Sequence, residues 1–267
     1  MPLFDVHAHL THDSFSSDVA SAVARAVQGG VTTIISNGLN PSDNAAVLAL
    51  SREFPAVKPA LGLYPVDAVL AAMRAAGEDY PDQRECWPAE ESVAWLRNHV
   101  GEAFAMGEIG LDGYWVKEPF WAAQEDVFRQ LVRLAQDAEK PIIIHTRKRE
   151  ERALEILEEL GATRVCWHCF GGRVRLARRV AERGHFLSIP ANARRSEAFT
   201  SMLRVLPKQQ ILLETDCPYL GPDRAQRNEP ANVVQTAEYA AEVWGMSVES
   251  VAVQLGENFE RLFGVAP

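Results

Sequence analysis

Histidines and carboxylates recur at the ends of short apolar segments of this chain. Imidazole nitrogens and carboxylate oxygens are the protein ligands that catalytic divalent ions use most. Four imidazoles and two carboxylates are too many for one catalytic ion that also binds water, but they suit two ions, which a single carboxylate can bridge. The six side chains in this position are His7, His9, Glu108, His145, His168 and Asp216.

The stretch FDVHAHL at residues 4–10 carries the first two of them. Side chains alternate faces along a strand, so Asp5, His7 and His9 are predicted to share the inward face. An isolated H-x-H is a weak signal, and two histidines with ordinary hydrogen bonds are its simpler interpretation. The four other candidate ligands, Glu108, His145, His168 and Asp216, make a metal site the better interpretation. His12 has the opposite parity and lies beyond the segment, so we do not predict it as a ligand.

Other residues with possible metal or nucleophile chemistry carry less weight. His99 lies in a helical pattern and His185 begins a strand, so both are interpreted as structural or solvated. Cys166 and Cys169 flank His168, but they fall on opposite faces and no second pair completes a zinc site. Cys217 is better placed for packing than for nucleophilic attack. The four cysteines show no disulfide framework, which predicts reduced thiols.

Eight β-like segments must position these side chains. They are short, rich in Val, Ile and Leu, and bounded by Gly, Pro or Asn, as strands of a buried parallel sheet are. An amphipathic helical pattern follows each one, and the last strand is followed by two. The predicted strands are 3–7, 31–37, 57–63, 103–109, 141–145, 163–168, 184–189 and 210–215.

This alternation predicts an α/β fold: a single (β/α)8 TIM barrel over residues 1–267 with an extra C-terminal helix. A doubly wound open sheet is the competing architecture. In a barrel, the carboxyl ends of the strands form the rim that carries the active site. The least regular region, residues 71–90, follows the third strand and is expected either to cover the site or to be an inert surface insertion.

Composition narrows the class of protein. The chain has 267 residues, 47% hydrophobic and 24% charged, with a formal net charge of −9. An acidic chain of this kind is not a general duplex-coating protein, so attraction of an anionic substrate would have to come from bound metal. We find no apolar run of bilayer length and no secretory signal, and we expect a cytoplasmic protein with no membrane partner.

Seven motifs together resemble the TatD family of metal-dependent deoxyribonucleases, which are TIM-barrel hydrolases. They run from the first predicted strand to the last helix. The motifs are DVHAHL at 5–10, MGEIGLD at 106–112, PIIIHTR at 141–147, WHCFGG at 167–172, LLETDCPYL at 212–220, NEP at 228–230 and ENFERLF at 257–263.

The resemblance implies a role for each of the six residues. His7, His9, Glu108 and Asp216 would hold one divalent ion. Glu108 would bridge to a second ion, completed by His145 and His168. Glu108 and Asp216 are therefore the predicted catalytic residues, with Asp216 orienting or deprotonating the attacking water. Asp5 and Glu214 would support the ligands from behind. The ligand types suit Mg²⁺, Mn²⁺ or Zn²⁺.

Substrate contacts are predicted on the same rim. Arg147 and either Arg224 or Arg227 are candidate phosphate contacts, although solvated surface arginines are an equally good interpretation of Arg224 and Arg227. Tyr114 and Trp115 are candidate base-stacking residues, with packing the better interpretation of Trp115. Family members commonly carry histidine in a G-x-H-P motif after the third strand, whereas this chain reads GLYP and has Tyr64 there.

Three functions follow as hypotheses. The first is a deoxyribonuclease that removes nucleotides from 3′ ends of DNA, with DNA ends or single-stranded DNA as substrate. The second is a barrel hydrolase acting on a small amide, ester or lactone. Related barrels with those activities often bridge their metals with a modified lysine on the fourth strand, where this chain has Glu108. The third is a partner-binding barrel that keeps metal only for stability.

Overall fold

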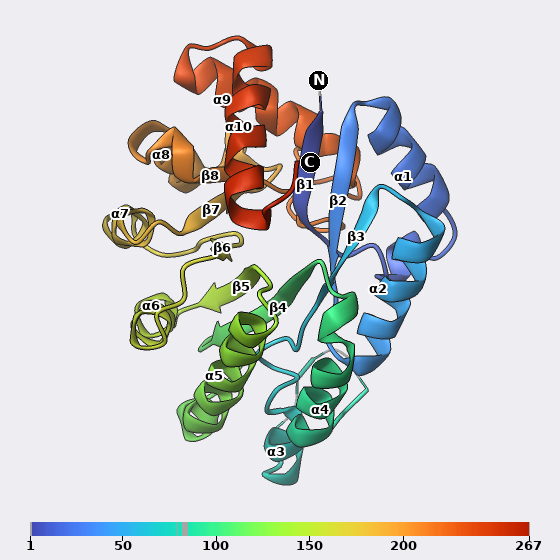
Figure 1. The fold of residues 1–267 in the computed structure, drawn as a ribbon, viewed down its shortest axis with the longest axis vertical. Coiled ribbons are helices and arrows are strands. Elements are labelled where there is room, and N and C mark those ends of the chain that lie inside the picture. The colour runs from blue at the N-terminus through green and yellow to red at the C-terminus, as the bar shows by residue number, and fades with distance from the viewer. Residues whose placement is uncertain (1, 79, 82–84, 267) are drawn as a thin grey trace.

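Eight parallel strands form one sheet whose spatial order follows the sequence from β1 to β8 (Figure 1). The computed structural model describes residues 2–78, 80–81 and 85–266. The strands are β1 Leu3–Ala8, β2 Val31–Asn37, β3 Val57–Leu61, β4 Ala105–Asp112, β5 Ile142–Arg147, β6 Val165–Trp167, β7 Phe186–Ile189 and β8 Ile211–Leu213.

The sheet closes on itself between β8 and β1. Ala8 and Cys217 form a parallel bridge, and the His9 backbone N–H donates to the carbonyl of Cys217 at 2.8 Å. The buried carboxylate of Asp5 adds to this seam by accepting from the backbone N–H and the hydroxyl of Thr215. The predicted eight-stranded barrel is confirmed, and the open sheet is excluded.

Helices cover the outside of the barrel, and one or more follow every strand (Figure 1). The extra C-terminal helix α10 is confirmed and packs against the start of β1, where the rings of Phe4 and Phe259 are 4.6 Å apart. The helices are α1 Val19–Gln28, α2 Pro41–Glu53, α3 Leu70–Ala75, α4 Ala89–His99, α5 Trp121–Asp137, α6 Glu150–Glu159, α7 Val174–Glu182, α8 Glu197–Val205, α9 Val233–Trp244 and α10 Val248–Phe263.

The main core fills the barrel and the layer between strands and helices. Strand residues such as Val6, Ile34 and Ile143 are fully buried, and α1 turns Ala22 and Ala26 toward them. Burial of each large aliphatic side chain contributes roughly 1.5–3 kcal/mol. A buried apolar core therefore supports the rim that carries the polar side chains. Among the described residues, no helix is long and apolar enough to cross a membrane.

A second, smaller apolar cluster lies beside the rim. Tyr64, Val66, Val69 and Met73, in and before α3, pack with Val116 from the loop after β4. The start of region 71–90 is thus helical, because the alanine-rich stretch from Leu70 favours a helix. Residues 79 and 82–84 of the region lie outside the described residues. Among its described residues, Met73 and Tyr80 pack with Val116 and Trp115 of the loop after β4.

Candidate metal centre

The six predicted ligands meet at the carboxyl-end rim of the barrel. His7 belongs to β1 and His9 follows it, while Glu108 lies within β4 and His145 within β5. His168 and Asp216 come just after β6 and β8. Both of these strands are shorter than predicted, because the chain turns sharply beyond them; Asp216 has a positive φ of 54°. This sparsely populated conformation is typical of functional sites.

Glu108 lies between two groups of histidines. Its Oε2 is 3.6 Å from the Nε2 atoms of both His7 and His9. Its Oε1 is 3.0 Å from Nδ1 of His145 and 3.4 Å from Nε2 of His168. The carboxylate is almost fully buried. Each of its oxygens thus faces a separate pair of imidazoles, which is the arrangement that a bridging carboxylate needs.

The donor atoms around the first pair fit a cation. The Nε2 atoms of His7 and His9 are 3.1 Å apart. Asp216 Oδ1 is 3.8 Å from the first and 3.5 Å from the second. Ligands at 2.0–2.2 Å from a tetrahedral ion are about 3.3–3.6 Å from one another. These clusters of buried histidine and carboxylate are consistent with the binuclear site of a metal-dependent hydrolase.

The electrostatics of the cluster also favour a cation. Burial lowers the pKa of His7 to about 3, so this imidazole is neutral at pH 7. Burial acts to raise the pKa of Glu108, but hydrogen bonds from His145, His168 and His7 outweigh it and hold the pKa well below its usual value. Burial acts to lower the pKa of His9, His145 and His168, but the neighbouring carboxylates outweigh it and raise all three pKa values, so an ion would take the place of protons on these rings.

The backbone of β4 is shaped around Glu108. The pairing of β4 with β5 shifts register between Met106 and Ile109, an irregularity common beside active sites. A Cβ on Gly62 would lie 2.4 Å from the Glu108 backbone nitrogen. Gly110 has φ +146°, and a Cβ there would lie 2.0 Å from the His145 carbonyl oxygen. Only glycine at these two positions lets β3 and β5 approach β4 this closely.

Asp112 is a functional residue that the sequence reasoning did not assign. Its buried carboxylate holds His145 through Oδ2, which is 2.9 Å from Nε2. Its Oδ1 accepts from the backbone N–H groups of Tyr114 and Trp115 at 2.7 Å each. Asp112 shares strand parity with Glu108, so the alternation that placed Asp5 and His7 on one face would also have indicated it.

Other buried groups orient the remaining rings. Glu214 Oε2 lies 3.4 Å from Nδ1 of His168, and the same carboxylate accepts from the Cys169 backbone N–H at 2.9 Å. His9 Nδ1 is 3.2 Å from the Asn37 carbonyl. Asp5 accepts from the His7 backbone N–H at 3.2 Å, besides its contacts at the barrel seam. Partners such as Glu214 and the Asn37 carbonyl fix ring orientation and tautomer, whereas Asp5 positions the backbone of His7.

Four predicted substrate-side residues lie on the side of the site that carries His145. The Tyr64 ring is nearly buried and meets the His145 ring edge-on, with centroids 5.0 Å apart. Arg147 is exposed, and its guanidinium stacks 3.7 Å above the Tyr114 ring. Trp115 is partly buried against the small cluster beside the rim, in line with its predicted packing role.

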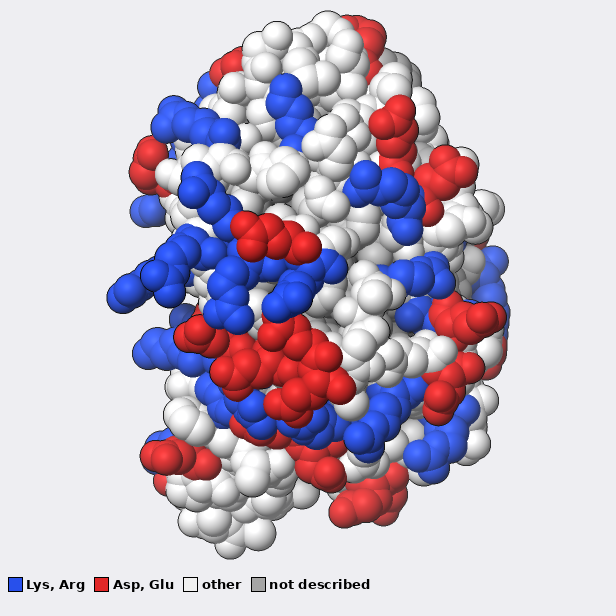
Figure 2. Space-filling model, turned by 60° about the vertical axis from the view of Figure 1, so that its left-hand side comes forward, with Lys and Arg blue, Asp and Glu red and all other residues white. Residues whose placement is uncertain are grey.

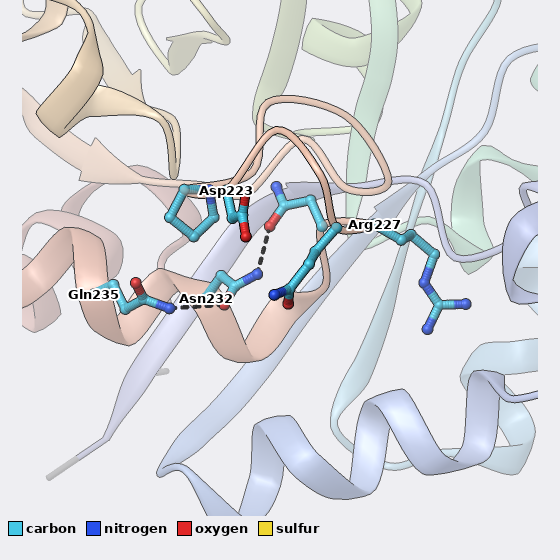
Figure 3. A pocket seen from close by; sticks show the side chains of 7 residues that line it. Asp223, Arg227, Asn232 and Gln235 are labelled. Carbon is cyan, nitrogen blue, oxygen red and sulfur yellow. Dashed lines mark hydrogen bonds between the residues drawn. The ribbon is translucent and has the colours of Figure 1, made fainter.

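Arg227 lies elsewhere. Its guanidinium pairs with Asp18 at 2.6 Å and stacks over Phe15. Figure 3 shows this side chain turned away from the other labelled residues of a polar surface pocket of about 300 Å³ in the β8–α9 region. The predicted phosphate contact of Arg227 stays a prediction, and Arg224 is exposed in the same loop. An Arg227–Asp18 pair, 209 positions apart, leaves no local sequence signal.

Asn228, from the NEP motif, has a role that sequence reasoning missed. It is buried and also lines this pocket. Its amide donates to the carbonyls of Thr215 and Tyr219 at 2.7 and 2.6 Å. These two residues flank Asp216. Asn228 therefore holds the loop that carries a predicted catalytic residue.

The three histidines that were not predicted as ligands make no close contact with Glu108 or Asp216. His12 is partly buried and caps a short 3₁₀ helix by accepting from the Ser14 backbone N–H. His99 stacks on Trp95 at the end of α4. His185 is buried, where it accepts from Trp167 Nε1 at 3.1 Å.

Surface charge is mixed rather than uniformly basic. Figure 2 shows Lys and Arg gathered on the flank that carries α6 and α7, directly beside a group of Asp and Glu. Ion pairs link the two helices, including Arg183–Glu158 at 2.6 Å and Arg179–Glu151 at 3.1 Å. The basic residues of this flank are thus partly neutralised, and the flank is not a continuous anion-binding stripe.

A closed parallel barrel with buried imidazoles and carboxylates at its carboxyl-end rim defines a TIM-barrel metal-dependent hydrolase. The family model described as TatD related DNase matches residues 4–264. The chain therefore belongs to the TatD family.

Known proteins of similar sequence and structure span nearly the whole chain. It is 32% identical to the uncharacterized metal-dependent hydrolase YabD of Bacillus subtilis, covering 98% of this chain and 99% of that protein. It is 28% identical to the 3′-5′ ssDNA/RNA exonuclease TatD of Citrobacter rodentium, with 98% of each covered. The crystal structure of the TatD homologue YjjV from Escherichia coli has a TM-score of 0.84 and 25% identity, with 98% of each chain covered.

Proposed function

We propose that this protein is a two-metal deoxyribonuclease that removes nucleotides from the 3′ ends of DNA, with residues 1–267 acting as one barrel domain. The observation that carries the proposal is Glu108, whose two oxygens face separate histidine pairs. The β4 segment AMGEIGLD holds this carboxylate and contains no lysine. The exonuclease activity named for the Citrobacter relative supports the choice of substrate.

The proposed ligand sets follow the geometry around Glu108. His7, His9, Asp216 and Glu108 Oε2 would hold one ion, and Glu108 Oε1 with His145 and His168 would hold the other. Mg²⁺, Mn²⁺ and Zn²⁺ suit these donors. Two divalent ions supply an activated water and neutralise charge on a phosphoryl group. They would also give an acidic protein a locally positive site for an anionic substrate.

The chain's own residues complete the proposed mechanism. Asp216 has one carboxylate oxygen toward His7 and His9 and is partly exposed, so it can orient the attacking water and accept its proton. Asp112 and Glu214 would fix the rings of His145 and His168. Arg147 would contact phosphate by charge-assisted hydrogen bonds.

Tyr64 favours a second candidate, hydrolysis of a small amide, ester or lactone. Its phenol lies beside His145 where family members commonly carry histidine. A phenol can donate one hydrogen bond to phosphate but brings no positive charge. A neutral substrate would therefore be tolerated at this position.

The test combines metal content with a substrate panel. Purified protein saturated with Mn²⁺ and desalted should hold about two ions per chain and should shorten single-stranded DNA from its 3′ end. Glu108→Ala should lose both properties, because it removes a ligand from each ion. Full activity in Glu108→Ala would refute the two-metal site. Hydrolysis of lactones or acyl amino acids with DNA left intact would refute the nuclease assignment and support the second candidate.

A further inference from the structure

Two tyrosines stand out from every other aromatic side chain in the described part of the protein. Tyr114 is 47% exposed and Tyr219 is 50% exposed, whereas the remaining aromatic residues there are buried or partly buried. A large aromatic surface left in water contributes little to folding. Aromatic side chains exposed beside a site are instead suited to contact a ligand.

Both tyrosines lie on the rim of the metal centre. Tyr114 is in the loop after β4 and Tyr219 in the loop after β8. The strand order of the closed barrel puts β4 and β8 on opposite sides. The six-residue cluster therefore lies between the two loops that carry them.

Each tyrosine is tied by its backbone to a carboxylate residue of the site. The Tyr114 N–H donates to Asp112 Oδ1, whose other oxygen holds His145. The Tyr219 N–H donates to the carbonyl of Asp216 at 2.9 Å. The position of each ring is thus coupled to one half of the cluster.

The surroundings of the two rings suit a nucleotide. Arg147 lies 3.7 Å from the centroid of the Tyr114 ring, and Lys148 lies 4.8 Å from it. The guanidinium already covers part of the Tyr114 ring, which leaves its exposed part, with two cations beside it, for a base. The Tyr219 ring meets His12 edge-on at 5.5 Å and lies 6.4 Å from His9.

We propose that Tyr114 and Tyr219 are positioning residues that stack one base on each side of the scissile phosphate. The ligand is a single-stranded nucleic acid end, and the inference rests on the proposed nuclease function. Stacking on aromatic side chains tolerates any base, since every base has a π face. In a duplex both faces of an internal base are already stacked, so this arrangement selects unpaired ends.

The test compares substrates with and without bases. Tyr114→Ala and Tyr219→Ala should each raise KM for a single-stranded oligonucleotide about 10-fold or more, with kcat nearly unchanged. The same oligonucleotide with its last two positions abasic should bind the wild type weakly and show little further change in either variant. Tyr114→Phe and Tyr219→Phe keep the ring and should reverse most of the increase in KM that the Ala variants show. Val253→Ala, at an exposed position of α10, is the remote control.

A second readout does not depend on catalysis. An oligonucleotide with 2-aminopurine at its 3′ end, mixed with protein in excess chelator, reports stacking by fluorescence quenching. The wild type and both Phe variants should quench it, and the Ala variants should quench it less. Unchanged KM and quenching in both Ala variants would overturn the stacking proposal and leave the nuclease function standing. A Mn²⁺-loaded wild type that cleaves neither oligonucleotide would overturn both.

Discussion

Asp112 is a residue whose exchange should change the chemistry of a neighbour without removing a predicted ligand. One of its oxygens is occupied by the N–H groups of Tyr114 and Trp115. In Asp112→Asn the amide oxygen must take that place, which turns the NH₂ group toward His145 Nε2. His145 then carries its proton on Nδ1, the atom that faces Glu108. We expect affinity for the second ion to fall about 10–100-fold.

Calorimetric titration of the chelated protein with Mn²⁺ measures this directly. The second binding event should weaken while the first is retained, and DNA cleavage should fall in parallel. Asp126→Asn makes the same chemical change at an exposed position of α5 and should bind both ions normally. If Asp112→Asn bound both ions with wild-type affinity, Asp112 would not control the tautomer of His145.

Single residues were predictable where a local pattern marked them. A polar residue at the end of an apolar strand is such a pattern. It predicted that His145 and Asp216 lie at the rim. Contacts between distant segments leave no such mark. The pairing of Arg227 with Asp18 and the hold of Asn228 on Tyr219 depend on loop conformation, which strand alternation does not describe.

At the level of elements, the strand pattern predicted all eight strands, but not where each one stops. Predicted strands 163–168 and 210–215 proved to be Val165–Trp167 and Ile211–Leu213. The residue types at the ends of these predicted strands are compatible with a strand. Cys169 and Asp216, which follow them, adopt positive φ and turn the chain. At these two strand ends the backbone conformation of the site, and not strand propensity, decides where the strand stops. The missed helix α3 lies in a stretch with too few turns to show a periodic pattern.

The contact between β6 and β7 should make folding stability depend on pH. Trp167 donates to His185 Nδ1, and Nε2 of His185 lies 2.9 Å from the Ala162 carbonyl. The contact with Trp167 requires an unprotonated Nδ1, and burial lowers the pKa of His185 below its usual 6.5. The unfolded chain binds this proton and the folded protein does not. The stability is therefore present above about pH 6.5 and is lost as pH falls below it.

Chemical denaturation at pH 7.5 and pH 5.5, in the presence of chelator, tests this. His185→Gln should be less stable than wild type at pH 7.5. It should also lose about 1 kcal/mol less than the wild type between the two pH values, because one titrating group contributes up to about 1.4 kcal/mol per pH unit. His7, with a pKa of about 3, titrates in both proteins below this range. Identical losses in the two proteins would mean that His185 is not kept neutral by the fold.

At the scale of the whole molecule, the barrel converts five strand ends into one site. β1, β4, β5, β6 and β8 each deliver at least one of the six residues. The order of these strands around the barrel follows from the alternation of strands and helices, so the sequence pattern was sufficient for the overall architecture. The closure at Ala8 and Cys217 brings the first and last strands together, and with them His9 and Asp216.

Because the proposed ligands come from strands far apart in the chain, metal binding should stabilise the entire barrel. An ion that binds only the folded state at 1,000 times its Kd adds about 4 kcal/mol. For a chain of this size that raises Tm on the order of 10 °C. Thermal unfolding with Mn²⁺ and with excess chelator should show this difference in the wild type and in Asp126→Asn. Glu108→Gln keeps the size of the side chain but weakens both sites, so most of the shift should disappear. An undiminished shift in Glu108→Gln would place the stabilising ions elsewhere, such as among the exposed carboxylates of α6.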